Sequence, residues 1–244
     1  MANSYFQFKQ FTVHQDRCAM KVTTDGCLFG AWVAEKAGSP ETEVRSILDI
    51  GAGTCLLSLM LAQKDRLAII DAIEIDKDTS EQASENVQAS PWSTQINIIH
   101  ADAGDFTFSK KYDMIISNPP FYEKELKGDD SKKNLAHHNE GLLLRGLLKI
   151  IKEQLAPDGK FFLLLPYKRN EEIKKLLLKN DMPVEQVVLV RQTPNHDYFR
   201  ILLQGKLAIG ERGETILSEI TIKDKEEKCS PEFQQLLKDY YLHL

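Results

Sequence analysis

The strongest constraint on the fold is a repeated alternation, from residue 45 onward, of short apolar runs with segments of helical periodicity. The apolar runs predict seven strands, at residues 46–50, 67–75, 95–100, 112–117, 160–165, 184–190 and 199–207. Near-continuously apolar strands separated by helices are typical of a mostly parallel sheet covered on both faces. Only residues 191–198 separate the last two strands, which is too few for a crossover, so the seventh strand should run antiparallel. The prediction is therefore an α/β fold with a seven-stranded, mostly parallel sheet, one antiparallel strand and helices on both faces.

The segments that flank this sheet are expected to complete a single domain spanning residues 1–244. Residues 1–40 would form an N-terminal extension with the first helix, residues 45–207 the core, and residues 208–244 a C-terminal extension. Residues 5–13 alternate in part between aromatic and polar side chains, which predicts a half-buried edge strand. The alternative is an aromatic and basic segment close to a nucleic-acid substrate. Pro157-Asp158-Gly159 predicts a turn, and Ser230-Pro231 predicts the start of a last helix.

The composition indicates a soluble chain in a reducing, cytoplasmic environment. No apolar run approaches the roughly 20 residues of a membrane span, and residues 1–6 lack the pattern of a secretion signal. The four cysteines form no Cys-x-x-Cys pair and have no histidine at metal-ligand spacing, so free thiols and no metal are expected. The net charge of −5 argues against a strongly basic nucleic-acid binder, although a local basic face is compatible with it. We expect a monomer.

A glycine turn after the first predicted strand is the first candidate ligand site. In Asp49-Ile50-Gly51-Ala52-Gly53, the two glycines let the backbone pass close to a ligand. The third glycine of a dinucleotide-binding G-x-G-x-x-G motif is missing, because Leu56 stands in its place, and this disfavours a pyrophosphate ligand. The alternative is a tight strand-to-helix turn without a ligand.

Two further carboxylates follow the next two strands. Glu74 ends the second strand about 20 residues after the glycines, where an acidic side chain can accept hydrogen bonds from a ribose diol. Asp102 follows the third strand, where it could accept from an adenine amine or could equally cap a turn. Ligands bind at the carboxyl ends of the strands in open α/β sheets, so Asp49, Glu74 and Asp102 together indicate a nucleoside without phosphates. S-adenosylmethionine fits this description.

The second candidate site is Asn118-Pro119-Pro120-Phe121, directly after the fourth strand. The prolines fix the backbone and remove two N–H donors, which leaves the Asn118 side-chain oxygen and the Pro119 carbonyl as rigid acceptors. Two such acceptors can hold a planar amino group and draw it toward tetrahedral geometry, which frees its lone pair for attack on a methyl sulfonium. Phe121 offers a ring on which a planar base can stack. The motif predicts methyl transfer by positioning, although a proline turn can also be purely structural.

With both motifs present, residues 20–207 resemble class I S-adenosylmethionine-dependent methyltransferases that modify amino groups. More narrowly, the chain resembles the bacterial family that methylates N6 of adenine 37 in a valine tRNA. The narrower resemblance rests on residues 6–13, residues 18–26 and the late His196-Asp197-Tyr198-Phe199-Arg200. It implies a Rossmann-like fold with one group of residues for each substrate. The cofactor would contact Gly51, Gly53, Glu74 and Asp102, and its methionine end would lie near Lys21 and Asp25. The target amine would be held by Asn118, Pro119, Pro120 and Phe121.

The implied function is N6-methylation of an adenine in a tRNA anticodon loop, where a single-stranded base can be splayed out and stacked. A local basic surface is expected from Lys9, Arg17, Lys127, Lys132, Lys133 and Arg200. Residues 123–139 are expected to form either a substrate clamp or a solvated loop, with His137-His138 as exposed polar surface. Three alternatives remain open: N5-methylation of a protein glutamine, N2-methylation of a guanine in ribosomal RNA, and a non-catalytic module that binds S-adenosylmethionine or RNA.

Overall fold

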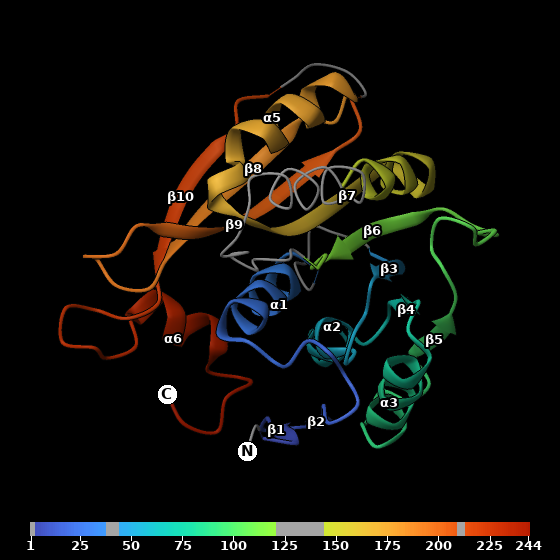
Figure 1. The fold of residues 1–244 in the computed structure, drawn as a ribbon, viewed down its shortest axis with the longest axis horizontal. Coiled ribbons are helices and arrows are strands. Elements are labelled where there is room, and N and C mark those ends of the chain that lie inside the picture. Colours follow the sequence, from blue (N-terminus) through green and yellow to red (C-terminus); the bar gives the residue numbers. More distant parts are fainter. Residues whose placement is uncertain (1–2, 38–43, 121–143, 209–212) are drawn as a thin grey trace, which may run out of the picture.

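An eight-stranded sheet forms the centre of the computed structural model, which describes residues 3–37, 44–120, 144–208 and 213–244 (Figure 1). Its strands are β3 Ser46–Ile50, β4 Ile69–Glu74, β5 Ile96–His100, β6 Tyr112–Ser117, β7 Leu155–Pro166, β8 Val184–Arg191, β9 Tyr198–Lys206 and β10 Ile216–Thr221. Their order is β10-β8-β9-β7-β6-β3-β4-β5. β9 pairs antiparallel with β7 and β8, and the other pairs in this sheet are parallel. The predicted antiparallel strand is confirmed, but the sheet has eight strands and not seven.

Two local features of the sheet differ from the prediction. The added strand β10 pairs with β8, and its first four residues are exposed, so it lacks the apolar run by which the other strands are recognised. The turn predicted at Pro157-Asp158-Gly159 lies inside β7. Tyr112 pairs with Leu155 and Met114 with Lys160, so residues 156–159 bulge out of the ladder. The buried Leu155 keeps its pairing with β6, and the turn residues are accommodated as this bulge.

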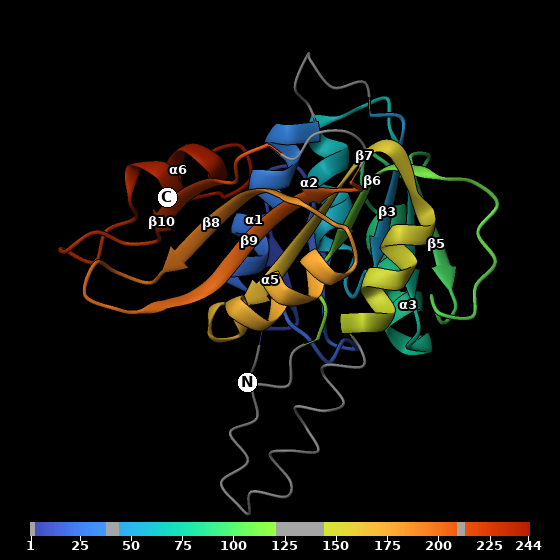
Figure 2. The same cartoon turned by 90° about the horizontal axis from the view of Figure 1, so that it is seen from above.

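Helices cover both faces of the sheet, as predicted (Figures 1 and 2). One face carries α1 Thr24–Ala37, α2 Leu56–Lys64, α3 Lys77–Gln88 and α6 Pro231–Leu237, and the other carries a helix at residues 144–154 and α5 Asn170–Lys179. An apolar core lies on each face of the sheet, and adjacent residues of a strand contribute to opposite cores. Phe162 packs in the core on the α1 side and Phe161 in the core on the α5 side. This alternation follows from the two-residue period of a strand. Ser230 caps α6 and Pro231 is its first residue, as predicted.

Residues 5–14 form a separate hairpin and not an edge strand of the large sheet. Its strands are β1 Tyr5–Gln7 and β2 Thr12–His14. The buried rings of Phe8 and Phe11 stack with centroids 4.5 Å apart, and the Lys9 N–H donates to the Tyr240 carbonyl at 2.8 Å. The aromatic alternation therefore reflects burial of the hairpin against the C-terminal segment.

The structure also bears on the expected state of the cysteines and on membrane and metal binding. Cys18, Cys27 and Cys55 are buried free thiols, and Cys229 is a partly exposed one. Across the described ranges, no helix is long and apolar enough to cross a bilayer, and no group of three His, Cys, Asp or Glu side chains could hold a metal ion.

A glycine on β9 provides a test of the packing between strands. A Cβ at Gly205 would lie 2.4 Å from the Phe161 ring and 2.9 Å from the Pro183 carbonyl oxygen, whereas one at the exposed Gly146 would meet no atom within 4 Å. Gly205→Ala should lower the free energy of unfolding by about 1–3 kcal/mol through overpacking. Gly146→Ala, in a helix, should raise it by up to about 1 kcal/mol. Chemical denaturation measures both, and equal stability of the two variants would contradict the packing described for β7 and β9.

Candidate functional site

The loop between β3 and α2 has an open backbone face. Gly51 and Gly53 have φ angles of 73° and 55°, in the left-handed region that favours glycine. The N–H groups of Gly51 and Ala52 donate to the Ile73 carbonyl at 2.9 and 3.1 Å, which anchors the loop to the end of β4. A Cβ at either glycine would meet no atom within 4 Å. The loop is therefore fixed from below and leaves space above it for a ligand.

Glu74, the last residue of β4, binds this loop directly. Its Oε2 accepts from the Gly53 N–H at 2.8 Å, and its Oε1 accepts from the Asp76 N–H at 3.0 Å. Asp76 caps α3 by accepting from the Thr79 N–H at 2.9 Å, and hydrogen bonds from the Thr79 side chain and from this N–H lower the pKa of Asp76. One nearly buried carboxylate thus joins the glycine loop to the turn that starts α3. Each carboxylate oxygen can accept a further hydrogen bond, so Glu74 can still receive ligand hydroxyls.

Asp49 lies beneath the loop and not on its open face. Its side chain is fully buried, and its Oδ2 accepts from the Ser58 hydroxyl at 2.7 Å. Its Oδ1 is buried without a hydrogen-bond partner among the described residues. Burial, with a smaller contribution from the charge of Glu74, raises the pKa of Asp49 to about 7. The structure thus gives Asp49 contact with α2 and no exposed surface for a ligand.

Asn118 stands beside the glycine loop, because the strands that carry them are neighbours in the sheet. The Ser117 hydroxyl donates to the Ile50 carbonyl at 2.8 Å, which ties the end of β6 to the residue before Gly51. The half-buried Asn118 directs its Nδ2 to the Met20 sulfur, 3.9 Å away. Pro119 is half-buried and Pro120 exposed, while Phe121 lies outside the described residues.

Asp102, Lys21 and Asp25 have protein partners in this structure. The exposed Asp102 follows β5 and accepts from the Gly104 N–H at 2.8 Å, as a turn-capping aspartate does. The Lys21 ammonium donates to the Gln15 carbonyl. Asp25, at the start of α1, accepts from Arg200 Nε at 2.7 Å, which ties α1 to β9. Asp102 follows the edge strand β5 and so lies at one end of the sheet. Asp25 lies beside β9 and close to the end of β6.

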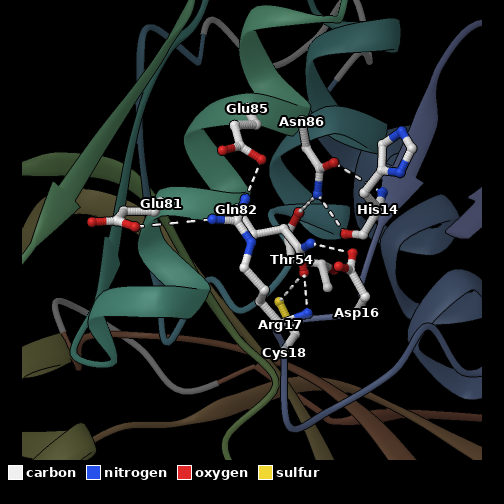
Figure 3. A network of polar contacts seen from close by, with 9 residues as sticks. All are labelled: His14, Asp16, Arg17, Cys18, Thr54, Glu81, Gln82, Glu85 and Asn86. Atoms are coloured by element: carbon white, nitrogen blue, oxygen red, sulfur yellow. Dashed lines mark hydrogen bonds and ion pairs between the residues drawn. The ribbon is translucent and has the colours of Figure 1, made fainter. Parts of the chain in front are cut away.

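Residues 14–18, which we call the N-terminal strap, cross α3 and connect it to the glycine loop (Figure 3). Asn86 donates to the carbonyls of His14 and Thr54 at 2.9 and 3.0 Å and accepts from the His14 N–H at 2.8 Å. Gln82 donates to Asp16 at 2.6 Å and accepts from the Arg17 N–H at 3.1 Å. Both amides are 1% exposed, so these bonds are made away from water. Buried hydrogen bonds therefore join the strap, α3 and the loop.

Several residues of this arrangement were not among the predicted site residues. Gln82 and Asn86 stand four residues apart next to the apolar Ala83 and Val87, a sign that buried amides occupy one face of α3. That sign does not identify their partners, which come from the strap and the loop. Ser117 could not be distinguished from any strand-terminal serine.

The expected basic surface is only partly described. Lys9 donates to the Lys238 carbonyl, Arg17 pairs with Glu81 and Glu85, and Arg200 pairs with Asp25. These three residues lie on different elements, and two of them face carboxylates. The other expected members, Lys127, Lys132 and Lys133, lie outside the described residues, as do loop 123–139 and His137-His138.

Comparison with known proteins agrees with this geometry. Residues 37–179 match the family model described as methyltransferase small domain. A tRNA1(Val) (adenine(37)-N6)-methyltransferase of Dyadobacter fermentans is 38% identical over 241 residues, which cover 98% of both chains. A protein of the same name from Parabacteroides distasonis is 38% identical over 246 residues, covering both chains completely. The crystal structure of a predicted O-methyltransferase from Agrobacterium tumefaciens covers 87% of this chain and 95% of its own, with a TM-score of 0.65 and 14% identity.

The sheet, its two layers of helices and the glycine loop define a Rossmann-like class I methyltransferase fold. The chain belongs to the family of tRNA1(Val) (adenine(37)-N6)-methyltransferases, within the broader methyltransferase small domain family. The family resemblance and the fold class predicted from the sequence are thereby confirmed.

The buried Asp49 predicts a dependence of stability on pH. Its pKa is raised from 3.8 to about 7 in the folded protein, so the folded state binds more protons than the unfolded state between these values. Stability from this group is therefore present at low pH and is lost as the pH rises through about 7. Between pH 5 and pH 8, Asp49 should lower the free energy of unfolding of the wild type by an amount on the order of 2 kcal/mol. Asp49→Asn should remove this decrease. Urea denaturation at the two pH values measures it.

An exposed aspartate supplies the matched control for this measurement. Asp78→Asn removes a carboxylate from the first turn of α3, on the surface. That variant should keep the pH dependence of the wild type. An identical pH dependence of wild type and Asp49→Asn would show that Asp49 does not titrate in this range.

Proposed function

We propose that the chain transfers a methyl group from S-adenosylmethionine to N6 of adenine 37 in a valine tRNA. The observation that carries this proposal is the junction between the glycine loop and Asn118, made by the hydrogen bond from Ser117 to Ile50. It sets a candidate cofactor loop and a candidate amine clamp side by side. The names of the relatives support the substrate, and the class I methyltransferase fold supports the cofactor.

The residues of the loop fit S-adenosylmethionine. Gly51 and Gly53 offer an open backbone, and Glu74 keeps acceptor capacity for a ribose diol. Asp102 would receive the adenine amine, while Lys21 and Asp25 would lie toward the methionine end. When bound, S-adenosylmethionine supplies an electrophilic methyl group on a sulfonium. Asp49 would act as a positioning residue, because it braces the loop through Ser58 without reaching its surface.

Asn118 and Pro119 would hold the target amine. Because Asn118 Nδ2 faces Met20, the amide is oriented with its Oδ1 available as an acceptor. The Pro119 carbonyl would accept the second hydrogen, and Pro120 keeps the pair rigid by fixing the backbone. Drawing both hydrogens toward these oxygens localises the nitrogen lone pair for in-line attack, and Phe121 would stack on the base. The rate then comes mainly from positioning, with no strong base required.

The proposal includes the setting of the reaction. The partner would be a tRNA, the chain would act as a monomeric single domain, and the location would be the cytoplasm. In a single-stranded anticodon loop the target base can leave its stack at low energetic cost.

A labelled-methyl assay tests the substrate. Purified protein with labelled S-adenosylmethionine should transfer label to unmodified valine tRNA, and changing adenine 37 to guanine should abolish the transfer. A protein release factor and ribosomal RNA, offered in parallel, should stay unlabelled. Label entering only the release factor would establish glutamine methylation instead, and label entering only ribosomal RNA would favour the guanine alternative.

Asn118 variants test the mechanism. Asn118→Ala removes one acceptor and should lower kcat on the order of 100-fold, because the amine loses its orientation. The affinity for S-adenosylmethionine, measured by calorimetry, should stay close to that of wild type. Asn118→Asp keeps an acceptor oxygen and should retain more turnover than the alanine variant. Loss of cofactor affinity in Asn118→Ala would assign the residue to cofactor binding and not to the amine.

A further inference from the structure

The carboxyl edge of the sheet continues beyond Asn118 into a group of aromatic and cationic side chains. Tyr167 opens the short helix η1 Tyr167–Arg169 directly after β7, and Tyr198 is the first residue of β9. β7 lies next to β6 in the sheet, and β9 lies next to β7. Because β9 runs antiparallel, its first residues lie at the edge where β7 and β8 end, as the pairing of Pro166 with Arg200 shows. Tyr167 and Tyr198 therefore share the edge that carries Asn118.

The rings of Tyr167 and Tyr198, the tyrosine pair, lie against each other with centroids 5.3 Å apart and planes tilted by 55°. Both residues are half-buried. Tyr198 belongs to neither of the two apolar cores, so its ring is not needed to fill the protein interior. Tyr167 packs in part against the core on the α5 side, and the solvent-facing part of the tyrosine pair offers a surface on which planar groups can stack.

Neighbouring strands hold Tyr198 in place. The guanidinium carbon of Arg191 lies 5.5 Å from the centroid of its ring, and its hydroxyl donates to Glu219 on β10. Arg191 in turn donates to Thr221 at 3.0 Å and to Glu219 at 3.1 Å. A ring fixed in this way loses little conformational entropy when a ligand stacks on it. β10, the strand that the sequence did not predict, thus supplies the support for this surface.

One cation beside the tyrosine pair is available to a phosphate. Lys168 follows Tyr167, is exposed, and has no carboxylate within ion-pair distance in the described part of the chain. Arg191 keeps 24% of its side chain exposed although it pairs with Glu219. Aromatic faces combined with cations are the means by which proteins bind single-stranded bases without reading their sequence.

We propose that the tyrosine pair, with Lys168 and Arg191, binds by stacking a nucleotide that neighbours the methylated base in the tRNA loop. This inference rests on the proposed function, because it gives the same site a second contact with its RNA substrate. A base that has left its stack exposes the faces of its neighbours, and holding one of these keeps the strand from closing again. The surface lies along the edge from Asn118, where the flanking strand would run.

Alanine and phenylalanine variants test the stacking. Tyr167→Ala and Tyr198→Ala should each raise the KM for valine tRNA about 5-fold to 150-fold, the range known for loss of one base–aromatic stack. The affinity for S-adenosylmethionine should not change, since the pair lies away from the glycine loop. Tyr167→Phe and Tyr198→Phe keep the rings and should stay near the KM of wild type. Tyr198→Phe also removes the hydrogen bond from the hydroxyl to Glu219 while keeping the ring, so it distinguishes the two contributions.

Two controls complete the experiment. Tyr5→Ala removes a 49% exposed tyrosine from the N-terminal hairpin and should leave the KM unchanged. Lys168→Gln should reduce the dependence of tRNA affinity on salt by about one counterion. If Tyr198→Ala fails to fold, as judged by its Tm, Tyr167→Ala and Lys168→Gln still decide the question.

The outcomes separate this inference from the proposed function. Absence of tRNA methylation by wild type would overturn the proposed function itself. Normal methylation by wild type with an unchanged KM in Tyr167→Ala and Tyr198→Ala would overturn the stacking surface alone. An increase in KM in the phenylalanine variants equal to that in the alanine variants would also overturn it, because the rings would then be dispensable. A raised KM only toward a protein substrate would assign the surface to a protein partner.

Discussion

The two hydrogen bonds accepted by Glu74 are the constraint on which the rest of the site depends. One fixes the glycine loop through Gly53, and the other fixes the turn at Asp76 from which α3 begins. α3 carries the buried amides that hold the N-terminal strap, and the chain beyond the strap brings Met20 against Asn118. Polar contacts, together with the chain between the strap and Met20, thus connect the candidate cofactor loop to the candidate amine clamp. Hydrogen bonds to a charged carboxylate in a nearly buried position are strong, so they hold the loop and the start of α3 in fixed relative positions.

The charged side chains differ between the two ends of the carboxyl edge of the sheet. The carboxylates of Glu74 and Asp76 lie at and just after the end of β4, where a ligand with a positive sulfonium would be favoured and phosphates would be repelled. The ends of β7, β8 and β9 carry Lys168 and Arg191. The net charge of −5 is compatible with an RNA substrate, since binding depends on how charge is distributed over the surface and not on the total.

Much of this arrangement could be predicted from the sequence, because it follows local rules. Apolar runs identified seven strands, and the short connection before Tyr198 gave the direction of β9. The positions of Glu74 at the end of β4 and of Asn118 directly after β6 could also be predicted, and their proposed roles rest on these positions. β10 could not, since an exposed edge strand has no apolar run, and neither could the hairpin at residues 5–14, whose aromatic residues pack on a segment more than 200 residues away. The buried side of the site, including Asn86 and Ser117, depends on contacts that no local pattern encodes.

The antiparallel strand has a consequence for the site that an all-parallel sheet would not provide. In a parallel sheet, the edge next to the ligand carries only strand ends and the loops that leave them. Reversal of β9 brings its first residues to that edge, so that Tyr198 meets Tyr167 from β7 and Arg200 reaches Asp25 at the start of α1. The edge therefore gains side chains that are held in a strand ladder, which is more rigid than a loop. A substrate that must be held on both sides of the reacting base needs rigid contacts of this kind beyond the cofactor pocket.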